Sequence, residues 1–170
     1  MNARQLKYAF LHKVAVFTDD KEHPVRNGVV QSVMYTLSDS GKKRCDADIR
    51  DLEMPNEVNK THCRHVHFKV KPTDTPRGAA VNADKPPSAH AENIRRAFME
   101  GQPVMIVIPG MEPTECAYIR AFLYTRNRSG KIICSCICVD RNREDSTMQA
   151  RIGYVFTKSE FAEKGIEKER

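Results

Sequence analysis

The chain has no tryptophan and no long apolar run, and aromatic residues make up only 7% of its 170 residues. Without tryptophan, any stacking on a base must use Tyr, Phe, His or Arg. No window approaches the roughly 18 consecutive apolar residues of a membrane span. Residues 1–14 lack the apolar stretch and the cleavage site of a signal peptide. We therefore expect a cytoplasmic protein, or a nuclear one in a eukaryote, with no membrane partner.

The sequence also lacks common metal-site spacings, since neither C-x-x-C nor H-E-x-x-H occurs. Its six cysteines are expected to be thiols, because disulfides are rare in the cytoplasm. Cys134, Cys136 and Cys138 lie two apart on one predicted strand, which is too extended an arrangement to close on one ion. We interpret these three as core residues and predict no metal and no cofactor.

A chain of this length normally forms one domain, so we predict a single domain over residues 1–170. Four prolines make 72–87 a long irregular loop, and the charged end at 166–170 is expected to fray. The net charge is +6 and the pI is about 9.1. This balance favours an anionic partner such as nucleic acid, either DNA or RNA.

Patterning in the first half predicts three strands. Aromatic and β-branched residues at 7–17 indicate the first strand, and the run 29–38 indicates the second. Dense charges of both signs at 42–60 favour an exposed connection with one short helical turn. Clean alternation in the segment 61–72 predicts a half-buried strand with a basic outer face.

Patterning in the second half predicts two helices, each marked by a cap. Ser88 precedes a helical period that ends at Gly101. The apolar run 104–108 indicates a central strand, and 116–140 reads as a hairpin. Thr157 and Glu160 form a capping box for the last helix. The whole is a β-rich α+β domain with six or seven strands and two or three helices.

The feature favoured for function is an aromatic and cationic face on the first strand of the hairpin. Aromatic planes can stack on bases, and Arg can stack or bind phosphate. The alternative is a strand buried on both faces, which would place the aromatic rings in the core. The predicted nucleic-acid-binding residues are Tyr118, Arg120, Phe122, Tyr124, Arg126, Arg128, Lys69, Lys71 and Arg77.

A second candidate is the histidine pair His65 and His67, which share one face of the predicted strand. Two imidazoles can divide acid and base roles in a phosphoesterase or nuclease, or can share one metal. No second histidine motif accompanies them, and a His–Lys face also suits a surface that meets phosphate. Catalysis by these two residues is therefore the alternative interpretation.

Element order supplies a resemblance over about a third of the chain. A helix, an E-G-Q-P-V strand, a short loop and an aromatic strand running through G-K into Val139-Asp140-Arg141 resemble PUA-like domains. The SRA (YDG) and EVE-type readers of modified DNA are the nearest of these. The Tyr-Asp-Gly signature is absent, with Tyr118-Ile119-Arg120 at that place, and no Gly-Gly-Arg-Asp-like loop precedes the helix.

The resemblance implies a curved barrel flanked by helices, with a pocket for a flipped nucleotide. It implies stacking by Tyr118 and Phe122 and backbone contacts by Arg77, Arg120 and Arg126. We therefore predict a curved mixed sheet or PUA-like barrel with two or three flanking helices. Its predicted function is nucleic-acid binding, reading a modified, flipped or single-stranded base. The alternatives are a small His- or metal-dependent phosphoesterase or nuclease, and a protein-interaction module that uses the strand edge at 118–124.

Overall fold

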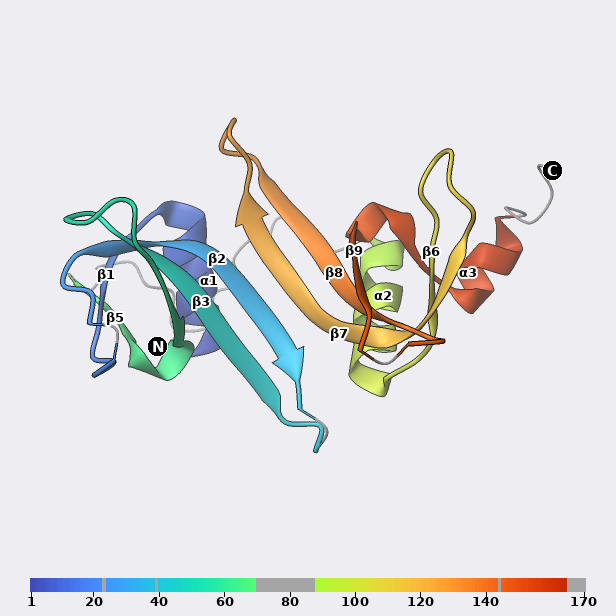
Figure 1. Cartoon of the computed structure of the whole chain (residues 1–170), viewed down its shortest axis with the longest axis horizontal. Helices are drawn as coiled ribbons and strands as arrows, with labels where there is room; N and C mark the ends of the chain where they lie inside the picture. The colour runs from blue at the N-terminus through green and yellow to red at the C-terminus, as the bar shows by residue number, and fades with distance from the viewer. Residues whose placement is uncertain (23, 39, 70–87, 144, 165–170) are drawn as a thin grey trace. The chain divides into compact units, whose positions relative to one another are not determined.

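The computed structural model describes residues 1–22, 24–38, 40–69, 88–143 and 145–164 (Figure 1). The helices are α1 (Ala3–His12), α2 (Ala89–Glu100) and α3 (Lys158–Glu163), and two 3₁₀ turns are η1 (Cys63–His65) and η2 (Ile152–Tyr154). The strands are β1 (Ala15–Thr18), β2 (Gly28–Leu37), β3 (Lys43–Asp51), β4 (Val58–His62), β5 (Val66–Phe68), β6 (Val104–Ile106), β7 (Thr114–Arg126), β8 (Ile132–Asp140), β9 (Thr147–Arg151) and β10 (Val155–Thr157).

The chain divides into two compact units. The first unit is Met1–Pro86 with Tyr124–Ile132, and the second is Pro87–Leu123 with Ile133–Arg170. The tip of the β7–β8 hairpin therefore belongs to the first unit and its body to the second. This division describes packing, and the expectation of a single folding domain stays a prediction.

The first unit is built on antiparallel pairing around β2. This strand pairs with β1 and with β3, β3 pairs with β4, and β1 pairs with β5. In the β1–β5 pair Phe17 lies opposite His67 and Thr18 opposite Val66. The pairing continues one step further, because the N–H of Asp19 donates to the carbonyl of His65 at 3.0 Å. This register places Phe17, Asp19 and His67 of the site described below.

A helix, α1, occupies most of the region in which composition predicted a strand at 7–17, so that prediction is wrong. Asn2 accepts a hydrogen bond from the N–H of Gln5, and Gln5 accepts one from the N–H of Asn2. This capping box satisfies N–H groups that the first turn would otherwise leave unpaired. The face that α1 buries in the first unit consists of Leu6, Ala9 and Phe10. Only the end of the predicted strand is extended, as β1.

The prediction of an exposed connection at 42–60 is also wrong, because β3 and β4 pair there. Cys45, Ala47 and Ile49 of β3 are buried, with the period of two expected of a strand. Asp48 of the same strand accepts a hydrogen bond from the Ser32 hydroxyl on β2. A hydrogen-bond partner on the neighbouring strand thus allows a charged residue to lie within the sheet.

The strand predicted in the segment 61–72 is present in part. Val66–Phe68 is extended, as β5, whereas the segment before it contains the end of β4 at His62 and the 3₁₀ turn η1. Val66 is buried, as the alternation predicted. Val70 and Lys71 lie outside the described residues, as does the irregular loop predicted at 72–87.

The structure of the second unit agrees more closely with the predictions made from the sequence. Ser88 caps α2, which ends at Gly101 in the left-handed conformation, and Thr157 and Glu160 form the capping box of α3. The hairpin of β7 and β8 is present, and β6 pairs with both β7 and β10. All six cysteines are free thiols, as predicted, and Cys136 and Cys138 are fully buried.

The structure confirms a β-rich fold with three helices among the described residues, but the sheet is not closed. Among those residues β5 and β10 end the order of paired strands and do not pair with each other. The predicted barrel is therefore not formed by this pairing. None of the described helices has both the length and the apolar content that crossing a membrane requires.

Close packing at Gly28 provides a test of the first unit's core. A Cβ atom there would lie 2.6 Å from Ile49 Cγ2 and 2.8 Å from Val25 Cγ1. We expect Gly28→Ala to lower the free energy of unfolding by about 1–3 kcal/mol through overpacking. Urea unfolding would measure this change.

Gly153→Ala is the matched control, since a Cβ at Gly153 meets no atom within 4 Å. It should leave stability unchanged or raise it by up to about 1 kcal/mol. Equal unfolding midpoints for Gly28→Ala and the wild type would contradict the packing described here.

Candidate functional site

The carboxylate of Asp19 joins the two histidines that the sequence singled out. Its Oδ1 lies 3.0 Å from His65 Nδ1, and its Oδ2 lies 2.9 Å from His67 Nε2. Hydrogen bonds from His67 and then from His65 hold the pKa of the Asp19 carboxyl below its ordinary value of 3.8. Asp19 is therefore ionised at neutral pH and fixes the orientation of both imidazole rings.

The remaining ring nitrogens of the pair are not equivalent. Arg64 Nε lies 2.8 Å from His65 Nε2 and donates to it, so both nitrogens of His65 are occupied. A His65 ring that carries its proton on Nδ1 satisfies both contacts. His67 keeps Nδ1 unbonded among the described residues. A pair that divides acid and base roles needs one available nitrogen on each ring, which this geometry does not offer. Catalysis by His65 and His67 stays a prediction.

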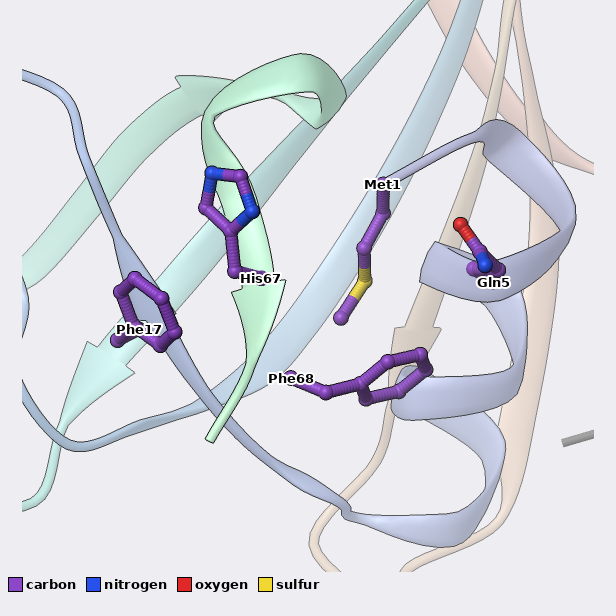
Figure 2. Close-up of a pocket in the computed structure, with 5 residues that line it drawn as sticks. All are labelled: Met1, Gln5, Phe17, His67 and Phe68. Carbon is purple, nitrogen blue, oxygen red and sulfur yellow. The ribbon is translucent and has the colours of Figure 1, made fainter. Parts of the chain in front are cut away.

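A pocket of about 360 Å³ opens beside His67. It is lined by Met1, which precedes α1, by Gln5 in the first turn of α1, by Phe17 of β1 and by His67 and Phe68 of β5 (Figure 2). The rings of Phe17 and His67 are stacked, with centroids 5.1 Å apart and planes inclined by 22°. The side chain of Phe17 is an exposed apolar group, with 37% of its surface accessible. The pocket thus has aromatic walls that solvent can reach.

The aromatic and cationic face predicted on β7 is divided by the structure. Tyr118 and Arg120 are exposed and belong to the second unit. Phe122 is buried, and its ring meets that of Phe98 edge to face at 4.9 Å. Phe122 is therefore a core residue, as the alternative interpretation predicted. Tyr118 and Arg120 are exposed and remain available for contact.

The end of β7 packs within the first unit. The ring of Tyr124 meets Tyr35 edge to face at 5.9 Å, and Lys7 Nζ lies 5.1 Å from the Tyr124 centroid. Arg126 Nη2 donates to the carbonyls of Phe10 and Leu11, both at 2.7 Å. Arg126 thus supports the end of α1, and both Tyr124 and Arg126 are only partly exposed.

Of the remaining predicted contact residues, Arg128 is exposed in the hairpin turn and Lys69 is exposed directly after β5. Lys71 and Arg77 lie outside the described residues. Within the described part of the chain, no group of three or more His, Cys, Asp or Glu side chains is arranged to hold a metal ion.

Sequence patterning missed Asp19 and Phe17 as site residues. Asp19 and Asp20 begin a polar stretch that reads as a turn, and the partners of Asp19 are 46 and 48 residues away along the chain. Only the β1–β5 register brings them together. In the sequence, only the two histidines at alternate positions, His65 and His67, indicated a site in this region.

The pKa of Asp19 tests this geometry. We expect the carboxyl carbon of Asp19 to titrate, by NMR, with a midpoint below 3.8 in the wild type. His67→Ala should raise the midpoint more than His65→Ala, because the hydrogen bond from His67 is the larger cause of the lowering. The stabilisation from these bonds is present above the ordinary value and is lost as the pH falls through the lowered pKa.

Glu115 is the internal control, because its pKa is lowered by Lys158 and Arg141 in the second unit. Its midpoint should not change in either histidine variant. An Asp19 midpoint at or above 3.8 in the wild type would show that the carboxylate does not bridge the two rings.

No family model, no curated protein and no solved structure matches this chain. The resemblance to PUA-like readers of modified DNA accordingly stays a prediction. The function is therefore inferred from the charge, exposure and contacts of the chain's own side chains.

Proposed function

We propose that the protein is a nucleic-acid-binding module and that its first unit provides the interface. The observation that supports this is the division of charge between the units. Among described residues the first unit has 15 Lys and Arg against 8 Asp and Glu, a formal net charge of +7. The second unit has 8 of each, a net charge of zero. The excess positive charge of the described residues therefore resides in one unit.

Most of these cations are in solvent. Thirteen basic side chains are exposed among the residues of the first unit that the structure describes, and exposed Lys and Arg are the groups that neutralise phosphates and release counterions. The exposed residues are Arg4, Lys13, Lys21, Arg26, Lys42, Lys43, Arg44, Arg50, Lys60, Arg64, Lys69, Arg128 and Lys131. Lys69 and Arg128 of this group were among the predicted contact residues.

The second unit is less suited to a polyanion. Arg141 and Lys158 both form ion pairs with Glu115, so two cations of the second unit are already paired with a carboxylate. Arg120 is exposed, as is Tyr118, but both residues lie in a unit without net charge. The proposal thus moves the main interface from the predicted face on β7 to the first unit.

Salt dependence tests the proposal. Binding of the whole chain to a fluorescent oligonucleotide should weaken steeply as salt rises, with log K linear in log salt concentration. Arg64→Ala with Lys69→Ala should weaken binding at every salt concentration. The double substitution should also reduce the slope by about one for each phosphate that is no longer neutralised. Fluorescence anisotropy at several salt concentrations measures both quantities.

Arg95→Ala with Arg96→Ala is the matched control, because it removes two exposed cations from α2 in the second unit. Affinity and slope should change little in this variant. No binding to DNA or RNA at low salt would reject the proposed function. An equal weakening in the control and the test variant would reject its assignment to the first unit.

A further inference from the structure

We propose that the pocket beside Phe17 and His67 receives one unpaired base of a single-stranded nucleic acid. This inference rests on the proposed function and specifies what the first unit contacts besides phosphate. The occupant is identified by three properties of the pocket, which are its wall, its size and the charges that flank it.

The wall of the pocket suits a flat ring with a polar edge. Met1, Phe17 and Phe68 supply apolar and aromatic surface (Figure 2). The Phe17 ring is parallel enough to His67 for a base to extend the stack, and base–aromatic stacking is tolerant of sequence. Asp19 holds His67 through Nε2, so this ring is fixed before any ligand arrives.

Two polar groups at the pocket can recognise a base edge. His67 has Nδ1 unbonded among the described residues. Gln5 accepts a hydrogen bond at Oε1 from the N–H of Asn2, which orients its amide and leaves the NH₂ group to donate. Because Nε2 of His67 donates to Asp19, Nδ1 of the same ring can accept a hydrogen bond from an N–H of a base. The Gln5 amide can donate to a ring nitrogen or a carbonyl oxygen of the base. A purely apolar ligand would leave both groups unpaired.

The size and charge of the pocket favour one base over a larger ligand or a phosphate. Its volume of about 360 Å³ is at the small end of ligand sites, which run from about 300 to 1,000 Å³. The ionised Asp19 carboxylate beside His67 would repel a phosphate placed next to that ring.

Cations lie on both sides of this segment in sequence, with exposed Arg64 before His67 and exposed Lys69 after it. The backbone N–H of Lys69 donates to the carbonyl of Ala15, so this residue continues the β1–β5 pairing. A base in the pocket would form hydrogen bonds with His67 and Gln5. Its neighbouring phosphates would be neutralised by Arg64 and Lys69.

The test compares an intact deoxythymidine oligonucleotide with an abasic one of the same length and charge. At fixed low salt the whole chain should bind the intact strand about tenfold more tightly, since one base stacked on an aromatic ring contributes roughly that factor or more. Phe17→Leu keeps an apolar side chain but removes the aromatic face, so it should reduce this preference to near one. A 2-aminopurine base in the strand should be quenched by the wild type and not by Phe17→Leu.

Tyr154→Ala is the matched control, because Tyr154 in the second unit has the same exposed fraction as Phe17, 37%. It should keep the full preference, and circular dichroism should confirm that both variants are folded. Equal affinity of the wild type for intact and abasic strands would overturn the base pocket while leaving the proposed function in place. A preference that survives Phe17→Leu would also overturn it. Failure to bind either strand would reject the proposed function itself.

Discussion

The candidate site depends on antiparallel pairing between β1 and β5. Each strand is short, and the pair sets Phe17 opposite His67. Because side chains alternate between the faces of a strand, a slip of β5 by one residue would turn the His67 ring to the face opposite Phe17. The bond from the N–H of Asp19 to His65 extends the pairing and places the carboxylate beside both imidazoles. One register therefore produces the stacked rings, the fixed histidines and the part of the pocket wall that β1 and β5 supply.

The positive charge of the first unit narrows the class of ligand that the aromatic pocket suits. An aromatic pocket alone suits many ligands, and a basic surface alone suits any polyanion. In this protein both features occur in the first unit, where the described residues have a net charge of +7. Phosphate contacts supply affinity without sequence information, whereas a base contact can discriminate. The combination is what a binder of single strands requires, and it needs no catalytic step.

Local sequence signals predicted the elements whose ends are marked by caps. Ser88 and the Thr157–Glu160 pair located α2 and α3, but the equivalent signal at Asn2 and Gln5 was missed because aromatic and β-branched residues followed it. Helix α1 forms because its buried face recurs at helical spacing, which outweighs composition. The site was less predictable than the fold. Asp19 acquires its role from partners more than 40 residues away, and no local pattern encodes that contact.

Photocrosslinking tests the central claim most directly, because it identifies the surface that touches the base. An oligonucleotide containing 5-iododeoxyuridine would be irradiated with the intact protein, and the crosslinked tryptic peptides would be mapped by mass spectrometry. Crosslinks are predicted on the peptide 14–21, which contains Phe17, or on 65–69, which contains His67. Crosslinks confined to the peptide 97–120, which contains Tyr118, would contradict the assignment of the interface to the first unit.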